Sequence, residues 1–351
     1  MSRPTVVARA PGRVNLIGDH TDYTGGLCLP IAIDRWVEVE VRPEAGSRVV
    51  ALFSDDEATA VAIPIDVVDA AAVEPPWGRF VAAVVKRLDL EHGFSGTVRS
   101  DVPIGAGLSS SAALEVAMAL ALAPNRLDPM ALAMLCRDAE HEARGVPTGL
   151  LDQLASVFGV AGHALLLDCS TNRITPTALP PDDEAEFVVI YGGARDLAST
   201  GYTDRVDECR RAEAEVGPLR TAAPADVERI TDPSVRRRAR HVVAENARVR
   251  EFAAAVAAER LDDAGRIMDA SHRSLRDDYE SSIPAIDALC DELKSQRGVL
   301  GARITGGGWG GCVVAMARPG CLADRGWADR AWIVRAVAGA SVVTTTDGAT
   351  N

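Results

Sequence analysis

The feature that most constrains this chain is a loop rich in glycine and serine, which reads Pro103-Ile-Gly-Ala-Gly-Leu-Ser-Ser-Ser-Ala112. The residues before it, 96–102, predict a short strand, and residues 112–123 are nearly all apolar and helix-forming. Such a loop lets backbone N–H groups approach a ligand, and the N-terminus of the following helix carries partial positive charge. Two interpretations are open from the loop alone: a phosphate-binding turn, or a strand-to-helix turn capped by a serine.

Two common nucleotide-binding motifs do not fit this chain. A Walker-type loop ends in Gly-Lys-Ser/Thr, but the only two lysines, Lys86 and Lys294, lie far from any glycine-rich turn. Residues Gly306–Gly311 satisfy G-x-G-x-x-G, yet Cys312–Ala317 follows and predicts a strand where the dinucleotide motif requires a helix. The sequence therefore excludes a P-loop nucleotidase and favours a strand–turn–strand unit around the second glycine run.

Composition limits the partners and the compartment. The net charge of −13 argues against nucleic acid as the main partner. The seven cysteines are scattered without a C-x-x-C pair, which is typical of a reducing compartment and argues against structural zinc. The apolar helix at 112–123 is too short to span a bilayer, and the N-terminus has no apolar segment of a signal peptide. We expect a cytoplasmic protein that binds neither nucleic acid nor membrane.

The length and the pattern of elements predict two domains. A chain of 351 residues can bury two hydrophobic cores. The segment Thr175–Asp183 is rich in proline and aspartate and is typical of a linker or an exposed loop. We therefore expect domains at residues 1–177 and 178–351, with helices and strands intermixed in both, which is an α+β organisation.

Local patterns predict the individual elements. A glycine-punctuated loop is expected at 11–30, a helix at 77–88, and a helix that begins after Asp128 and ends at Gly145. The charged segment 235–260 predicts a helix with solvated faces. The tail 344–351 is expected to be frayed.

Polar residues gather in two further segments that could carry chemistry. The turn-rich stretch Pro11–Gly26 contains the kind of cluster that binds a polyhydroxylated ligand: Arg13, Asp19, His20 and Asp22. Glu140 and Asp152 lie on two expected helices joined by residues 145–149. For each segment the alternative is a structural one, namely a polar surface loop in the first case and solvated helix carboxylates in the second.

Taken in order, these segments resemble the galactokinases of the galactokinase–homoserine kinase–mevalonate kinase–phosphomevalonate kinase (GHMP) family. The resemblance covers most of the chain and rests on five motifs: Pro11–Gly26, Pro103–Ala112, Ala139–His141 with Gly149–Gln153, Ser271–Glu280 and Gly301–Cys312. It implies the two-domain GHMP kinase fold, with an N-terminal α/β domain resembling ribosomal protein S5 domain 2. The second domain would be ferredoxin-like α+β, with the active site in the interdomain cleft and a monomer as the functional unit.

The resemblance also implies transfer of the γ-phosphoryl group of ATP to the anomeric hydroxyl of a hexose, with galactose as the expected acceptor. Asp152 matches the base that takes the hydroxyl proton, and Arg13 matches the residue that stabilises the developing charge. Glu140 matches a magnesium ligand, together with Ser110 or Ser111, and oxygen donors of this kind suit a hard cation.

The same comparison assigns the substrate contacts. The sugar-binding positions are Asp19, His20, Asp22, Gly149 and Tyr202. The adenine pocket would be lined by Trp77 and Phe80, for which a core helix is the alternative. The phosphate-binding positions are Gly105, Ala106, Gly107, Leu108, Ser109, Ser110, Ser111 and Ala112.

Several positions depart from the family pattern. Asp19 stands where glutamate is usual, and Asp196 stands where histidine is usual. Both changes fall outside the phosphoryl-transfer residues. They therefore bear on which hexose is the acceptor and not on the type of reaction. Two other hypotheses follow: a kinase for another hexose or sugar derivative, and a catalytically silent regulator that binds sugar and ATP. The complete run Ser109–Ala113, with Asp152 and Arg13 in place, argues against the regulator.

Overall fold

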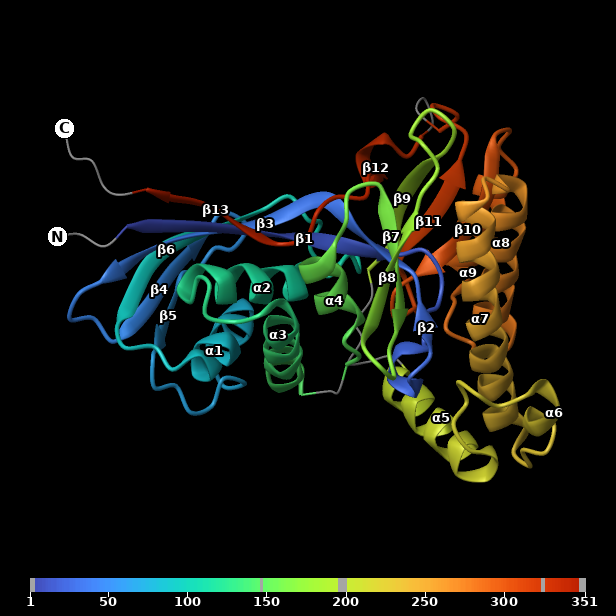
Figure 1. The fold of residues 1–351 in the computed structure, drawn as a ribbon, viewed down its shortest axis with the longest axis horizontal. Helices are drawn as coiled ribbons and strands as arrows, with labels where there is room; N and C mark the ends of the chain where they lie inside the picture. Colours follow the sequence, from blue (N-terminus) through green and yellow to red (C-terminus); the bar gives the residue numbers. More distant parts are fainter. Residues whose placement is uncertain (1–3, 146–147, 195–200, 323–325, 347–351) are drawn as a thin grey trace.

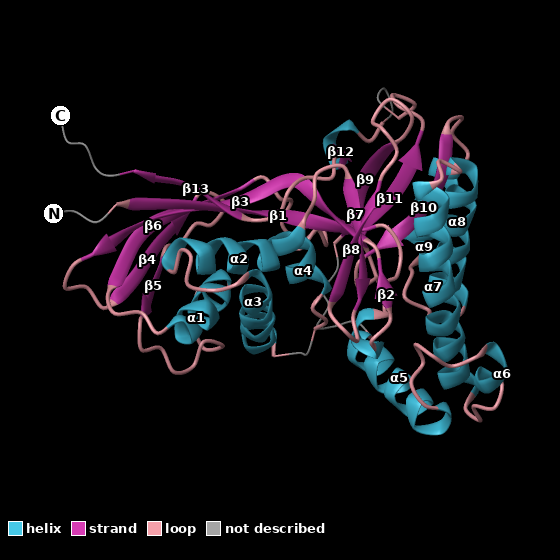
Figure 2. Cartoon of the chain, viewed as in Figure 1, coloured by secondary structure: helices cyan, strands magenta, loops and turns pink. Residues whose placement is uncertain are grey.

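The computed structural model describes residues 4–145, 148–194, 201–322 and 326–346. Figure 1 shows two halves side by side, with the blue and cyan elements in one and the yellow and orange elements in the other. Figure 2 shows that both halves combine helices with sheet. The expected intermixing of helices and strands is therefore observed in both.

The first half is a six-stranded sheet with helices on one face (Figure 1). The strand order is β13-β1-β3-β6-β4-β5, and the β4–β6 pair is parallel whereas the others are antiparallel. The strands are β1 (Thr5–Asn15), β3 (Pro30–Glu44), β4 (Val49–Ser54), β5 (Val61–Pro64), β6 (Gly93–Ser100) and β13 (Ser341–Thr346). The helices are α1 (Trp77–Leu88), α2 (Ser110–Leu122), α3 (Pro129–Arg144) and α4 (Leu151–Phe158).

Helix α3 shows how local chemistry sets these bounds. The Asp128 side chain accepts the N–H groups of Met130 and Ala131, and Pro129 fits the first turn because its missing N–H is not needed there. Gly145 ends the helix in the left-handed conformation at φ 70°. The expected bounds of α3 are confirmed, and so are those of α1 at residues 77–88.

The second half packs helices against a four-stranded sheet of order β10-β11-β9-β12. Its strands are β9 (Glu186–Gly193), β10 (Val299–Thr305), β11 (Gly311–Ala317) and β12 (Ala331–Val334). Its helices are α5 (Tyr202–Val216), α6 (Pro224–Val227), α7 (Pro233–Ala257), α8 (Leu261–Asp277) and α9 (Pro284–Lys294). The predicted strand–turn–strand around Gly306–Gly311 is confirmed, because β10 and β11 pair on either side of it.

A three-stranded sheet lies between the halves and consists of β2 (Leu27–Cys28), β7 (His163–Asp168) and β8 (Arg173–Ala178). Short 3-10 turns occupy Asp22–Thr24 and Ala328–Arg330. The prediction of a loop from Thr175 onward was wrong in its first residues, because β8 pairs with β7 through Ala178.

Three other sequence expectations need correction. The loop expected at 11–30 is shorter, because β1 continues to Asn15, which pairs with Pro30 of β3. The tail is not frayed at its start, since residues 344–346 belong to β13 and pair with β1. Helix α7 is not simply solvated, because several of its charged side chains are buried, as described below. Strand β13 joins the first sheet, and the division into domains at residues 1–177 and 178–351 stays a prediction.

Candidate active site

A cavity of about 670 Å³ lies where the elements of the two halves meet. Its walls come from β1, the turn at residues 18–22, helix α1, the loop at 105–111, helices α3 and α4, the start of α5 and the turn at 306–307. Residues far apart in sequence therefore share one concave site, which is the usual form of a small-molecule site.

Arg13 and Asp152 form an ion pair in this cavity. Arg13 comes from β1 and Asp152 from the first turn of α4. The Nε and Nη2 atoms of Arg13 each lie 2.7 Å from Oδ1 of Asp152. The other carboxylate oxygen accepts the hydroxyl of Ser109 at 2.5 Å. Both oxygens of Asp152 are thus fixed in direction, and its side chain remains about a quarter exposed to the cavity.

The glycine–serine loop is tied to the same arginine. Nη1 of Arg13 donates to the Gly107 carbonyl at 2.6 Å, and the Arg13 amide donates to the Leu108 carbonyl at 3.0 Å. Gly105 and Gly107 have φ values of 73° and 81°, which glycine adopts without strain. Ser109 lies at φ 60° and makes no side-chain cap, so the alternative of a simple serine cap is not observed.

Glu140 lies beside the start of α2. Its Oε1 accepts the hydroxyl of Ser111 and Nε of Arg144, both at 2.9 Å, and its Oε2 accepts Nε2 of Gln153 at 2.9 Å. Behind it, Glu115 is completely buried, and burial followed by the nearby charge of Glu140 raises the pKa of Glu115 well above its usual value. The described residues contain no group of three or more His, Cys, Asp or Glu side chains that could hold a metal.

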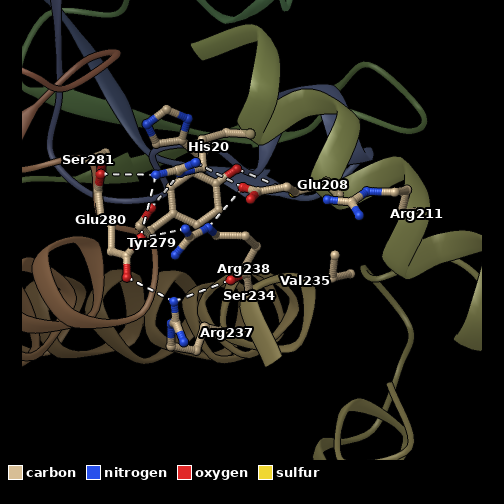
Figure 3. Close-up of polar contacts among 12 residues, drawn as sticks. His20, Glu208, Arg211, Ser234, Val235, Arg237, Arg238, Tyr279, Glu280 and Ser281 are labelled. Atoms are coloured by element: carbon tan, nitrogen blue, oxygen red, sulfur yellow. Dashed lines mark hydrogen bonds and ion pairs between the residues drawn. The ribbon is translucent and has the colours of Figure 1, made fainter. Parts of the chain in front are cut away.

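His20 and Asp22 form the opposite wall of the cavity. His20 lies in the left-handed region at φ 64°, and its ring packs on that of Tyr279 with centroids 4.5 Å apart (Figure 3). Its Nδ1 is 3.0 Å from the hydroxyl of Tyr23. Burial, with a further contribution from the charge of Asp152, raises the pKa of Asp22 to about 6.

Gly149 and Tyr202 complete that wall. A Cβ atom added at Gly149 would lie 1.7 Å from Oδ2 of Asp22, so only glycine lets the backbone approach this carboxylate. Tyr202 is the first residue of α5, and its ring centroid lies 5.7 Å from that of His20.

An ion network centred on a buried arginine anchors helix α5 and the segment that follows α8. Arg238 of α7 is 2% exposed and donates to Glu208 of α5 at 2.9 Å and to Glu280 at 2.6 Å. Figure 3 shows these groups around Tyr279, with His20 over the same ring. The hydroxyl of Tyr279 also contacts the hydroxyl of Tyr23. This network holds in place the Tyr279 segment and helix α5, which pack against His20.

Asp19 is buried, and both of its carboxylate oxygens contact other groups of the protein. One of its oxygens contacts Nη2 of Arg303, and the other accepts the Gly306 amide at 2.9 Å. Burial raises the pKa of Asp19, although the charge of Arg303 opposes that shift. The carboxylate borders the cavity, but its strongest contacts are with the protein.

Most of the predicted site residues converge on this cavity. Those that line it are Arg13, Asp19, His20, Asp22, Phe80, Gly105, Gly107, Ser109, Ser110, Ser111, Glu140, Gly149, Asp152 and Tyr202. Four do not line it: Trp77, Ala106, Leu108 and Ala112 are buried in the core. Trp77 is directed away because its indole N–H donates to the Thr59 carbonyl at 3.1 Å. Asp196 lies outside the described residues.

The sequence analysis missed several lining residues, including Asn15, Arg79, Arg144 and Gly306. Arg144 could have been found from its position four residues after Glu140, which allows the ion pair on one helix face. The glycine run at 306–308 was recognised as a turn and as part of a family motif, but no site role was assigned to it. No local sequence pattern distinguished Asn15 from the other polar residues of the segment Pro11–Gly26.

Family and structural comparisons agree with this geometry. The description "Galactokinase galactose-binding signature" matches residues 1–43, "GHMP kinases N terminal domain" matches 78–160 and "GHMP kinases C terminal" matches 252–326. The mevalonate kinase of Methanococcus jannaschii shares the fold, with a TM-score of 0.68 and 18% identity over 94% of this chain and 98% of that one. Fold and site therefore define a GHMP-type small-molecule kinase, as expected from the sequence.

Relatives with higher sequence identity show which GHMP kinases this chain resembles. A galactokinase of Roseiflexus sp. (strain RS-1) is 42% identical over 334 residues, covering 89% of this chain and 83% of the relative. The galactokinase of Homo sapiens is 38% identical over 333 residues, covering 90% and 84%. The Lactococcus lactis galactokinase complexed with galactose superposes with a TM-score of 0.86 and 27% identity, over 97% of this chain and 95% of that one. The chain belongs to the galactokinase family.

Among the residues that the structure describes, no helix is both long and apolar enough to cross a membrane.

The close approach at Gly149 gives a first prediction. In Gly149→Ala the new methyl group would displace the Asp22 carboxylate, because the two cannot occupy the same space. We expect sugar affinity to fall at least tenfold while nucleotide affinity stays within twofold, as measured by calorimetric titration of each ligand. Gly326→Ala is a matched control, because nothing lies within 4 Å of its added Cβ and its backbone is not in the left-handed region. Unchanged sugar affinity in Gly149→Ala would contradict the role of this contact.

The shifted pKa of Asp22 gives a second prediction. Since its folded value of about 6 lies above the usual 3.8, the charged carboxylate destabilises the fold, and this cost grows between about pH 4 and 6. Asp22→Asn should therefore raise the melting temperature above pH 7, and the gain should shrink toward pH 4. Thermal unfolding at pH 4.5, 6 and 8 measures this, with the exposed Asp183→Asn as a control. A gain independent of pH would be inconsistent with this assignment.

Proposed function

We propose that this protein transfers the γ-phosphoryl group of ATP to the anomeric hydroxyl of galactose, giving galactose 1-phosphate and ADP. The observation that carries the proposal is the Arg13–Asp152–Ser109 cluster, which lies between the glycine–serine loop and the His20–Asp22 wall. A nucleotide seated on the loop and a sugar on that wall would meet at this cluster. The relatives named galactokinase support galactose as the acceptor.

Asp152 is placed to take the proton of the attacking hydroxyl. Its carboxylate is held from one side by Arg13 and from the other by Ser109, so it presents a fixed acceptor to the cavity. Arg13 also fixes the Gly107 carbonyl, which couples the base to the phosphate-binding loop. In phosphoryl transfer, positioning and charge neutralisation supply most of the rate, and one rigid cluster provides both.

Magnesium fits the residues at the start of α2. Glu140 and the hydroxyls of Ser110 and Ser111 line the cavity beside the loop, and all are hard oxygen donors. One carboxylate suits an ion that keeps waters and takes its other ligands from phosphates, as Mg²⁺ does. When bound, the ion would neutralise charge on the transferring phosphoryl group. Ser111 and Gln153 hold the Glu140 carboxylate in place for it.

A kinase for another hexose is the second candidate. The contacts of Asp19 favour this second candidate. Both of its carboxylate oxygens contact Arg303 and Gly306, so the side chain does not extend toward a sugar as a longer one would. The silent regulator has weaker support, since the predicted catalytic pair lies in direct contact. All seven cysteines are free, which supports our proposal of a cytoplasmic location. The monomer stays a prediction for sedimentation analysis.

The role of Asp152 gives a third prediction. Asp152→Asn keeps the shape but cannot accept the proton, so turnover should fall by about 10²–10⁴. Steady-state ADP release with saturating ATP, magnesium and galactose measures it, and calorimetric binding of galactose shows whether the site is still formed. A turnover within about threefold of the wild type would remove Asp152 from this role.

The acceptor itself is tested by a panel of hexoses with ATP and magnesium. We expect galactose to give the highest kcat/KM. Poor turnover of galactose beside good turnover of another hexose would favour the second candidate. Absence of ADP formation with every sugar, despite sugar and nucleotide binding, would favour the regulator.

A further inference from the structure

Asn15 is a buried polar side chain whose amide is unmatched by the protein. It is the last residue of β1 and is 1% exposed. Within the part of the chain that the structure describes, neither its amide oxygen nor its amide nitrogen has a partner at ordinary hydrogen-bond distance. A buried amide in that state costs free energy, so native structures rarely keep one without a ligand or a bound water to satisfy it.

The position of Asn15 directs it toward the substrate cavity. Successive residues of a strand point to opposite faces, so Asn15 shares a face with Arg13, and both line the cavity. The main chain at Asn15 is fixed, because its carbonyl accepts the hydroxyl of Thr305 at 2.8 Å. A fixed backbone with an unmatched amide is typical of a binding residue and not of a loosely packed one.

The groups around Asn15 show which of its hydrogen-bonding atoms can reach a ligand in the cavity. Asp19 lies close enough for the amide to favour its charged form and lower its pKa, although burial has the larger and opposite effect. Yet both oxygens of Asp19 already contact Arg303 and Gly306. Even with one N–H of Asn15 directed at Asp19, its second N–H and its amide oxygen are available to a ligand.

We propose that the side-chain amide of Asn15 binds one hydroxyl group of the hexose, between Arg13 and Asp19, and so helps to select the sugar. A hydroxyl both donates and accepts, and the amide offers an acceptor and two donors to match it. This inference rests on the proposed function in so far as the ligand is a hexose. It adds to the predicted sugar contacts a residue that none of them included.

The test compares three variants by calorimetric binding of galactose and of ADP, and by steady-state kinetics. Asn15→Leu removes all hydrogen bonding at similar volume, and Asn15→Asp removes the donors. Ser156→Ala is the matched control, because it removes a buried hydrogen bond to the same strand at the Pro11 carbonyl and leaves Asn15 and its contacts in place. We expect the two Asn15 variants to weaken galactose binding about 5–10-fold or more, with ADP binding within twofold. Ser156→Ala should lower the melting temperature but leave galactose binding within twofold.

Monodeoxy galactoses, each lacking one hydroxyl, identify the group that is bound. One of them should lose affinity for the wild type by the same factor that Asn15→Leu loses for galactose, and should lose nothing further in the variant. If every deoxy sugar loses as much in Asn15→Leu as in the wild type, the amide binds no hydroxyl and the inference is overturned. Unchanged galactose binding with a lower melting temperature would overturn it too, because the amide would then serve only the fold.

The proposed function can fail separately. If the wild type does not phosphorylate galactose but does phosphorylate another hexose, the acceptor assignment is wrong. The same variants and the deoxy forms of that hexose then decide the role of Asn15.

Discussion

The buried ion pair between Asp19 and Arg303 is the interaction on which the site depends most. Arg303 is completely buried in β10, and its Nη1 also donates to the Leu16 carbonyl at 2.9 Å. One guanidinium thus holds the turn after β1 at two points. Removing one partner of a buried pair leaves an uncompensated charge, which typically costs about 3–5 kcal/mol. The turn that carries His20 and Asp22 is therefore fixed to the second half of the molecule.

A second buried carboxylate strengthens this attachment. Glu245 of α7 accepts the Gly18 amide at 3.1 Å and the Ser271 hydroxyl of α8 at 2.5 Å. Burial would raise its pKa, but the charges of Arg248 and its other neighbours prevail and lower it to about 2. It therefore stays charged at neutral pH. The predicted sugar wall is held by contacts from β10, α7 and α8, so the cavity forms only when both halves are folded together.

Sequence reasoning was successful where the physics is local. The cap at Asp128, the proline after it and the glycine at 145 define α3 without any knowledge of its neighbours. It failed where tertiary contacts decide. The charges of α7 follow an exposed pattern, yet Arg238 and Glu245 are buried because partners arrive from other elements. The pairing of β13 with β1 joins the two ends of the described chain, and no local pattern indicates that.

The site residues follow the same division. The glycine–serine loop was recognisable from composition, but Trp77 and Phe80 lie three positions apart on one helix, and only the packed structure shows that Phe80 alone lines the cavity. Asn15 was not singled out from the sequence, because only the packed structure shows that its buried amide has no ordinary hydrogen-bond partner among the described residues. Arg13 and Arg303 form ion pairs with Asp152 and Asp19, whereas burial and then the charge of Asp152 raise the pKa of Asp22. An uncharged, hydroxyl-rich ligand supplies donors to that carboxylate without adding charge, and this makes a sugar the ligand that the electrostatics of the wall favour.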